Sequence, residues 1–260
     1  MSDSSTGNRR PPKATRCSAR QAAAQRRAQR QRMMTFAGIA LAAAIALAAV
    51  LIFVNRDDDA PTDSGQAVAW SELPSDGRVL GDADAPVEFV VYSDFQCPFC
   101  KQFDEQDLPK VIENYVADGE VKVEWRPMPI ISQAPLDSPD NESVQAAEAA
   151  MCAADQEQFW PYSEALYAAQ GAENAGVYSD EMLKQTAADV GLDTAAFNEC
   201  LDSGEKQEEV LALRQEGTES GVQGTPTFLI NDQLVSYTLE GYDKLKDQLQ
   251  DALDGNRVEG

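Results

Sequence analysis

The sequence predicts an α/β fold, a split sheet interrupted by a block of helices, which follows a single transmembrane helix. Three stretches predict it: a strand–helix–strand unit over 87–125, an Ala-, Gln- and Glu-rich helical stretch over about 138–218, and a strand–strand–helix unit over 227–253. The 260 residues are 43% apolar and 25% charged. This composition is ordinary for a globular protein and excludes a disordered, collagen-like or multi-span chain.

Charge is distributed very unevenly along the chain. The net charge is −23, yet residues 1–32 carry nine basic side chains and one acid, Asp3, and so form a basic tail of charge +8. The other residues carry 12 basic and 43 acidic side chains, and so −31. Such an acidic body repels phosphate, which excludes nucleic acid as its expected partner. The chain has no histidine, which excludes Cys-His and Ser-His-Asp catalysis and histidine-ligated zinc.

Residues 33–54 form an uncharged run of 22 residues, MMTFAGIALAAAIALAAVLIFV. About 20 apolar residues in a helix span the hydrocarbon core of a bilayer. A cleaved signal peptide is the alternative, but the apolar region of a signal peptide is usually about 7–15 residues long. We therefore predict an uncleaved signal anchor at 33–54.

Basic residues predict the orientation of this span. Nine of them precede it, and Arg56 alone follows it before a run of acids that begins at Asp57. Because Lys and Arg favour the cytoplasmic side, we expect a single-pass protein of the cell membrane with a cytoplasmic tail at 1–32 and an extracytoplasmic domain. Residues 55–79, rich in Asp, Pro, Ser and Gly, are expected to form an acidic flexible linker.

This topology divides the five cysteines into two groups. Cys17 stays in the reducing cytosol, where we expect an idle thiol. Disulfides persist outside the cytoplasm. The cysteines expected there are Cys97, Cys100, Cys152 and Cys200.

Hydrophobic patterns predict the first three elements of the domain. The run 87–92 (VEFVVY) is nearly all apolar, as in a buried central strand. A helix follows and reaches about residue 116. The run 121–125 (VKVEW) alternates apolar and charged residues, as a half-buried strand does.

Start and stop residues divide the helical stretch that follows. Asp180 begins one helix that Gly191 ends, and Asp193 begins another that Gly204 ends. This stretch therefore forms a small helical subdomain. Its aromatic residues are predicted to belong to the core: Phe159, Trp160, Tyr162 and Tyr167.

Strand character returns near the C-terminus. The strands 227–230 (TFLI) and 234–237 (LVSY) flank a hairpin loop at 231–233. The last helix, about 242–253, presents leucines along one stripe, and a short tail, 254–260, ends the chain.

Cys97-Pro98-Phe99-Cys100 lies directly after the buried strand and opens the first helix. The N–H groups and dipole of a helix N-terminus stabilise negative charge on the first cysteine, and the i, i+3 spacing brings the second sulfur beside it. Pro98 suits the first helical position, which needs no N–H donor. Thiols in such settings have pKa values of about 3.5–7.5. We expect Cys97 to be the exposed attacking thiol and Cys100 the more buried resolving thiol.

A zinc half-site and an inert disulfide are the alternatives for this motif. A four-cysteine zinc site normally needs a second C-x₂-C, whereas Cys152 and Cys200 are 48 positions apart. We therefore predict no metal and no cofactor.

Four segments in this order resemble the DsbA-like thioredoxin-fold disulfide oxidoreductases, and most of all their membrane-anchored Gram-positive and actinobacterial members. The segments are SDFQCPFC, CAADQEQFWPYSEALY, FNECL and GVQGTPTFLIN. The resemblance covers residues 80–253. It implies a thioredoxin fold with a helical subdomain inserted at about 138–218.

The same resemblance implies roles for individual residues. Cys97 attacks and Cys100 resolves. Pro226, which on its own could be a simple turn device, forms a cis peptide bond with Thr225 and packs against the active-site disulfide. The backbone at Thr225 would pair with an extended stretch of substrate. The predicted substrate-contacting residues are Thr225, Pro98 and Phe99.

Two positions depart from the family pattern. Family members often carry a glutamate six residues before the first cysteine, as a buried proton carrier for the resolving thiol. Val91 occupies that position here, and Glu88 lies three residues earlier. Some relatives carry a histidine between the cysteines that stabilises the thiolate, which Phe99 does not do. The strength of this protein as an oxidant and the identity of a proton carrier therefore stay open.

We interpret Cys152 and Cys200 as a structural disulfide that ties two helices of the inserted subdomain. In the chain-entropy model, closing a loop of about 50 residues stabilises a protein by roughly 4 kcal/mol. A second redox pair that relays electrons is the alternative, although the neighbouring sequence shows no activating feature.

These features together predict an extracytoplasmic thiol–disulfide oxidoreductase that donates disulfides to secreted or surface proteins as they emerge unfolded. The resemblance implies reoxidation by a quinone-linked membrane partner of the DsbB or vitamin-K-epoxide-reductase-like (VKOR-like) type. Two alternatives stay open. One is a reductase or isomerase fed with electrons through the membrane, and the other is a non-catalytic thioredoxin-like binding module.

Overall fold

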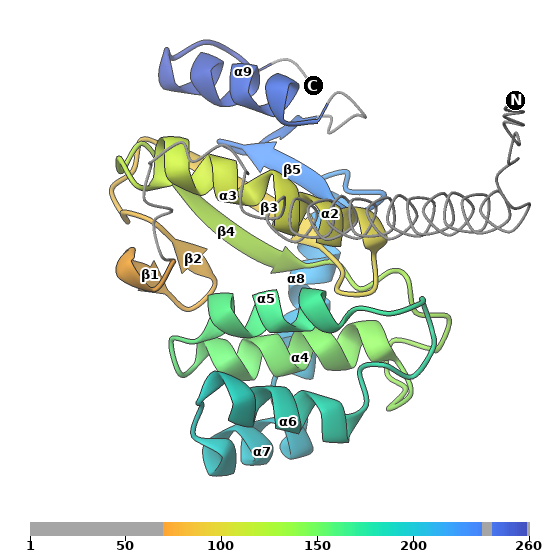
Figure 1. Ribbon diagram of the computed structural model, residues 1–260. Coiled ribbons are helices and arrows are strands. Elements are labelled where there is room, and N and C mark those ends of the chain that lie inside the picture. Colours follow the sequence, from red (N-terminus) through yellow and green to blue (C-terminus); the bar gives the residue numbers. More distant parts are fainter. Residues whose placement is uncertain (1–69, 236–240, 259–260) are drawn as a thin grey trace, which may run out of the picture. The chain divides into compact units, whose positions relative to one another are not determined.

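The computed structural model describes residues 70–235 and 241–258, which belong to one compact unit at 66–260. Figure 1 shows these residues in colour. The predicted cytoplasmic tail at 1–32 and the predicted signal anchor at 33–54 lie outside the described residues. Among the helices of the described ranges, none is long and apolar enough to cross a membrane.

A mixed sheet forms the centre of this unit, and its six described strands have the order β1-β2-β4-β3-β5-β6 (Figure 1). They are β1 (Ser75–Asp76), β2 (Val79–Leu80), β3 (Val87–Ser93), β4 (Val121–Pro127), β5 (Thr227–Ile230) and β6 (Gln233–Val235). β3 and β4 run parallel, and the other neighbouring pairs are antiparallel. The predicted α/β class is confirmed.

β3 is a central strand because it is apolar on both faces. It pairs with β4 on one side and β5 on the other, so that Phe89 lies beside Val123 and Ile230. Apart from Glu88, its residues are buried, whereas those of β4 alternate between buried and half-buried. Both patterns are as predicted. The carboxyl end of β3, at Ser93, leads directly into the loop that carries the cysteine motif.

The single helix predicted after the cysteines is broken. α2 (Pro98–Gln106) ends at Asp107, α3 (Leu108–Val111) follows, and a π-helical turn spans Ile112–Val116. Pro109 lacks an N–H group and cannot continue the hydrogen-bond ladder of α2, so the chain starts a new helix around it. The helical segment still ends at residue 116, as predicted.

The inserted subdomain lies between β4 and β5 in the sequence. Its helices are α4 (Glu142–Ala154), α5 (Phe159–Ala169), α6 (Asp180–Val190), α7 (Thr194–Ser203) and α8 (Gln207–Glu219). Ser179 and Asp193 cap α6 and α7, and Gly191 and Gly204 end them with φ of 88° and 66°. Glycine adopts this left-handed conformation without the steric cost of a Cβ. Figure 1 shows α4 to α7 stacked together below the sheet and α9 above it.

Aromatic rings join the inserted subdomain to the sheet. Phe95 stacks on Trp125 with 5.0 Å between ring centroids, and Phe159 and Tyr167 contact the same pair at 5.1 and 4.9 Å. The predicted core aromatics of the subdomain are at most 4% exposed, so that prediction is confirmed. Burial of these large rings is the main attraction between subdomain and sheet.

The β5–β6 hairpin turns on two residues instead of the predicted three. Ile230 pairs with Gln233, which leaves Asn231 and Asp232 as the turn. Both turn residues have positive φ, 48° and 63°. This is the type I′ geometry that Asn and Asp tolerate in two-residue hairpins, and it places Gln233 inside β6.

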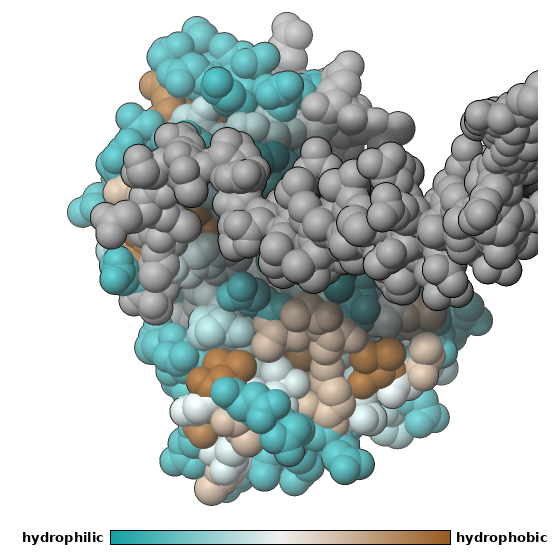
Figure 2. Space-filling model, in the orientation of Figure 1, coloured by the Kyte–Doolittle hydropathy of each residue, from teal (hydrophilic) through white to brown (hydrophobic). Residues whose placement is uncertain are grey.

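The last helix, α9 (Tyr242–Leu253), buries Leu245 and Leu249 of its leucine stripe and packs against β3 and β5. Its outward surface is hydrophilic on the face that Figure 2 shows. Within the predicted tail 254–260, Val258 is only 4% exposed and belongs to the core. Residues 236–237, which were predicted to end the second hairpin strand, lie outside the described residues.

The folded domain begins earlier than predicted. β1 and the first residue of β2 fall within the stretch assigned to the linker, 55–79, and β2 joins the sheet beside β4. Trp70 packs edge-on against Trp160 with 5.8 Å between ring centroids, and Arg78 forms an ion pair with β4. The sheet and α5 therefore hold residues 70–79, although their composition resembles that of a linker. The earlier part of the predicted linker lies outside the described residues.

Cys152 of α4 and Cys200 of α7 form the predicted disulfide, with 5.9 Å between their Cα atoms. Both residues are buried, at 1% and 8% exposure. The bond ties the two helices together inside the subdomain.

We expect the Cys152→Ala/Cys200→Ala double variant to lose up to about 4 kcal/mol of unfolding free energy. The reason is that the bond closes a loop of 48 residues in the unfolded chain. Denaturant titration measures this loss. Disulfide exchange at Cys97 should keep its rate in the folded variant, and a slower exchange would favour the electron-relay alternative.

Candidate active site

Cys97 is the N-cap residue of α2, with φ −77° and ψ 119° in the extended region. Its carbonyl oxygen accepts hydrogen bonds from the N–H groups of Cys100 and Lys101 at 3.1 and 3.2 Å. Pro98 takes the first helical position, as its missing N–H allows. The Cys97 thiol therefore lies at the positive end of the α2 dipole, where negative charge is stabilised.

Asp94 fixes the loop between β3 and α2. Its buried carboxylate accepts hydrogen bonds from the N–H groups of Gln96, Ile130 and Ile131 at 2.8–2.9 Å. Its carbonyl oxygen accepts one from the Cys97 N–H at 2.9 Å. Burial raises the pKa of the Asp94 carboxyl, and the N–H bonds oppose that rise. The sequence reasoning missed Asp94, although a carboxylate directly after a buried strand was a usable signal.

The inserted subdomain holds the same loop from the other side. The Gln170 side-chain amide donates hydrogen bonds to the carbonyls of Phe95 and Cys97 at 2.6 and 3.0 Å. The Tyr178 hydroxyl also donates to the Phe95 carbonyl, at 2.8 Å. Nothing in the sequence distinguished Gln170 from the other glutamines of this Gln-rich stretch.

A loop from the C-terminal half of the domain completes the site. The Thr225–Pro226 peptide bond is cis, which confirms the expectation for Pro226. The Thr225 carbonyl oxygen accepts a hydrogen bond from the Cys97 Sγ at 3.2 Å. The structure thus brings the cysteine motif and the Thr225–Pro226 loop together. The Cys152–Cys200 disulfide is not part of this site, because it joins α4 and α7.

The prediction that Cys97 is exposed is wrong. Cys97 is 3% exposed and Cys100 is 1% exposed. Cys97 is covered because the Thr225 carbonyl, from a loop that sequence patterns did not place, lies against its sulfur. Cys100 is still the more deeply buried of the two, as expected. Phe99, between them, is 58% exposed.

The two thiols, both free in this structure, have opposite pKa shifts. The hydrogen bond from Cys100 is the main reason that the pKa of Cys97 falls from 9 to about 6. Bonds from Thr225 and from the N–H groups of Cys100 and Phe99 lower it further, against the effect of burial. Burial raises the pKa of Cys100 well above 9, and Cys97 raises it further. At neutral pH the pair therefore carries a thiolate on Cys97 and a protonated thiol on Cys100.

Comparison with known proteins agrees with this geometry. A thioredoxin family model matches residues 74–251. "Probable disulfide bond formation protein D" of Bacillus anthracis is 26% identical over 213 residues, which are 81% of this chain and 94% of that protein. The crystal structure of oxidised BdbD from Bacillus subtilis has a TM-score of 0.62 at 25% identity, over 70% of this chain and 97% of that one. A segment of the Na(+)/H(+) antiporter NhaA 3 of Salinispora tropica is 33% identical over 162 residues, 61% of this chain but 22% of the antiporter.

The fold and the paired thiols define the class of protein, a thioredoxin-fold thiol–disulfide oxidoreductase. The chain belongs to the DsbA-like branch of the thioredoxin family and is a protein-disulfide oxidoreductase. The predicted thioredoxin fold with an inserted helical subdomain is confirmed.

We expect the alkylation rate of Cys97 in the reduced protein to follow a titration curve with its midpoint near pH 6, because the thiolate is the nucleophile. Cys100→Ala removes the thiol that contributes most to the lowered pKa of Cys97, so its midpoint should lie higher. Iodoacetamide labelling resolved by mass spectrometry measures both curves. A wild-type midpoint near 9 would contradict the lowered pKa.

Proposed function

We propose that this oxidoreductase donates disulfides to secreted or surface proteins as they emerge unfolded, through its Cys97–Cys100 pair. The observation that carries this proposal is the low pKa of Cys97 beside the high pKa of Cys100. A thiolate that is stabilised only in the reduced state favours that state, and a pair that prefers to be reduced is a strong oxidant. Such a pair passes its disulfide on to other thiols.

The proposed transfer has two exchange steps. A substrate thiolate attacks the Sγ of Cys97, the Cys97–Cys100 bond breaks, and Cys100 receives the electron pair and a proton. A second substrate thiolate then attacks the substrate sulfur of the mixed disulfide, which forms the new disulfide and releases Cys97 as a thiolate. The low pKa of Cys97 makes it a good leaving group in this second step. The protein keeps two electrons, which a quinone-linked membrane partner of the DsbB or VKOR-like type then accepts.

The location of this activity is part of the same proposal. The uncharged run at 33–54 and the basic residues before it support a single-pass anchor with the catalytic domain outside the cytoplasm. Proteins that emerge from the membrane unfolded expose apolar side chains and thiols together. Phe99 offers such chains an apolar contact between the two cysteines, at 58% exposure. The backbone at Thr225, against Cys97, would pair with an extended stretch of the substrate.

A reductase or isomerase is the second candidate. The apolar Phe99 between the cysteines favours it, because a phenyl ring adds no positive charge to stabilise the Cys97 thiolate. The non-catalytic alternative has no comparable support, since the chain belongs to an oxidoreductase family.

The reduction potential of the Cys97–Cys100 pair separates donor from reductase. We expect the full-length protein, equilibrated in graded thiol/disulfide buffers, to give a value near about −120 mV. A value near about −270 mV would overturn the donor direction and favour the reductase.

Phe99→Ser should lower kcat/KM for oxidation of a reduced, unfolded polypeptide about three- to tenfold, since roughly 1 kcal/mol of apolar contact is lost. Oxidation of dithiothreitol should keep its rate, because this small dithiol makes no such contact. Equal losses with the two substrates would show that the cysteine pair itself had changed and would contradict the assigned contact.

A further inference from the structure

Glu148 is a buried acid on α4 of the inserted subdomain. It is 7% exposed, and no described residue donates a hydrogen bond to its Oε1. Burial raises the pKa of Glu148 to about 7, and a hydrogen bond from Gln207 opposes the rise. A buried carboxylate with an unpaired oxygen is costly, so the structure offers no packing reason for an acid at this position.

Glu148 lines a pocket with a volume of about 300 Å³. Four helices meet there, namely α4, the start of α6, the end of α7 and the start of α8, together with the loop at 137–139. Pockets of this size are typical of small-ligand sites. None of the lining residues belongs to the cysteine motif or to the Thr225–Pro226 loop, so the pocket is separate from the redox site.

The other charged residues of the lining are all acids, namely Asp137, Asp180 and Asp202. The Lys184 Nζ is 3.1 Å from a carboxylate oxygen of Asp180 and also pairs with Asp202. Among the described residues, no lysine or arginine pairs with Asp137 or Glu148. With Glu148 ionised, the four carboxylates and the one ammonium have a net charge of −3. The pocket therefore attracts a cation.

The spacing of these acids favours an extended cation over a metal ion. Ca²⁺ and Mg²⁺ bind oxygens at about 2.0–2.6 Å and so need several ligand atoms close together. Within the part of the chain that the structure describes, no three of the pocket's carboxylates bring their oxygens within 4.8 Å of one another. A guanidinium group spreads its charge over five N–H donors and forms two parallel hydrogen bonds with one carboxylate. It is also less strongly hydrated than an ammonium group, so it enters a buried site at a lower cost.

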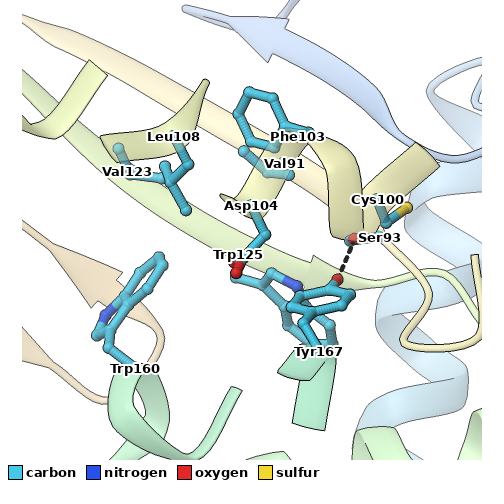
Figure 3. A pocket seen from close by; sticks show the side chains of 10 residues that line it. All are labelled: Val91, Ser93, Cys100, Phe103, Asp104, Leu108, Val123, Trp125, Trp160 and Tyr167. Carbon is cyan, nitrogen blue, oxygen red and sulfur yellow. Dashed lines mark hydrogen bonds between the residues drawn. The ribbon is translucent and has the colours of Figure 1, made fainter. Parts of the chain in front are cut away.

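The other acid whose pKa burial raises to about 7 is Asp104. It lines, with Cys100, the cavity that Figure 3 shows. That cavity has a volume of about 10 Å³, close to what one water molecule needs, and is too small for a guanidinium group. The pocket of Glu148 is open to solvent, since the side chains of Asp180 and Asp202 are 61% and 57% exposed. Of the two acids, Glu148 alone faces a space that admits a ligand.

A second acidic pocket, of about 290 Å³, lacks these features. Arg78 lines it and brings a positive charge of the chain's own. Asp155 is paired with Lys206, and Glu157 accepts a hydrogen bond from the Gly77 N–H. This pocket is therefore a matched control for non-specific attraction of cations.

We propose that the pocket of Glu148 binds a guanidinium group, with the Glu148 carboxylate accepting two N–H hydrogen bonds and the more exposed acids adding attraction. The group is either the end of an arginine side chain in a polypeptide or a free guanidinium compound, because both present the same fork of donors. A bound arginine would attach a polypeptide to the inserted subdomain, outside the redox site. This recognition does not depend on the direction of thiol exchange, so it goes beyond the donor function proposed above.

The test uses glycine amides as local reporters. Gly204 lines the pocket of Glu148, and Gly77 lines the second acidic pocket. Full-length protein labelled with ¹⁵N-glycine, in detergent micelles, is titrated with N-acetyl-argininamide and followed by NMR. We expect the Gly204 signal to shift and saturate while the Gly77 signal stays in place. In Glu148→Gln the apparent Kd should rise about tenfold or more, because a charge-assisted pair at a buried site is lost.

The pH dependence of binding identifies the group that holds the cation. Guanidinium stays charged near neutrality, whereas Glu148 ionises with a pKa of about 7. Because the cation binds the ionised form, its affinity should increase about tenfold between pH 6 and pH 8. Glu148→Gln should remove this dependence. The other titratable groups that face Glu148 are Asp137 of the loop before α4, Asp180 and Lys184 of α6, and Asp202 of α7.

Two controls and a peptide sharpen the assignment. Glu209→Gln removes an exposed acid from the second pocket and should leave the Kd at Gly204 within about twofold of the wild type. N-acetyl-lysinamide should bind about fivefold more weakly or worse, since an ammonium group cannot form the two parallel bonds. A neutral peptide with one arginine separates the two sources. Tighter binding than N-acetyl-argininamide would indicate a protein partner, and equal binding a free guanidinium compound.

Four results would overturn the proposal. They are a Gly204 signal that does not move, an equal shift of Gly77, an unchanged Kd in Glu148→Gln, and equal affinity for the lysine compound. If Glu148→Gln does not fold, the wild type still decides the matter, because an affinity that stays constant from pH 6 to pH 8 contradicts binding to Glu148. None of these results bears on the reduction potential of the cysteine pair, so the two proposals fail separately.

Discussion

The rest of the site depends on the stabilisation of one negative charge, on Cys97 at the N-terminus of α2. A helix terminus alone contributes a modest electrostatic effect that falls off within one turn, so the sulfur must be held very close to it. Three separate parts of the chain do this. Asp94 anchors the loop from below, Gln170 holds its carbonyls from the subdomain, and Thr225 covers the thiol. The buried strand β3 leads directly into this loop and fixes where the loop begins.

The inserted subdomain has a similar consequence for the second thiol. It provides Tyr167 and Trp160, which close the cavity behind Cys100, and its aromatic contacts with the sheet keep this cavity small. Cys100 is thereby only 1% exposed, and burial is the main cause of its raised pKa. The inserted subdomain thus stabilises the loop that carries Cys97, and it also increases the difference between the pKa values of Cys97 and Cys100.

Local features of the sequence predicted the strands and the helix ends well. They did not predict contacts between residues that are far apart in the chain. The strands at 87–92 and 121–125 and the helix ends at Gly191 and Gly204 follow from periodicity and turn chemistry within a few residues. The burial of Cys97 depends on a loop 128 residues away, and no pattern near the motif indicates that loop's position. The burial of Asp104, which is 7% exposed, was not predicted either, because an acid on the Gln- and Glu-rich α2 resembles a solvated residue until the packing of α5 is known.

The protonation of Asp104 also bears on how strongly the pair oxidises. An ionised carboxylate one turn below Cys100 would repel the thiolate on Cys97 and raise its pKa, which would favour the disulfide. Burial keeps Asp104 neutral below its pKa of about 7, so the thiolate is not opposed under those conditions. Above that pH the carboxylate forms and the reduced state loses part of its advantage. Ionisation of this one buried carboxyl group therefore weakens the protein as an oxidant.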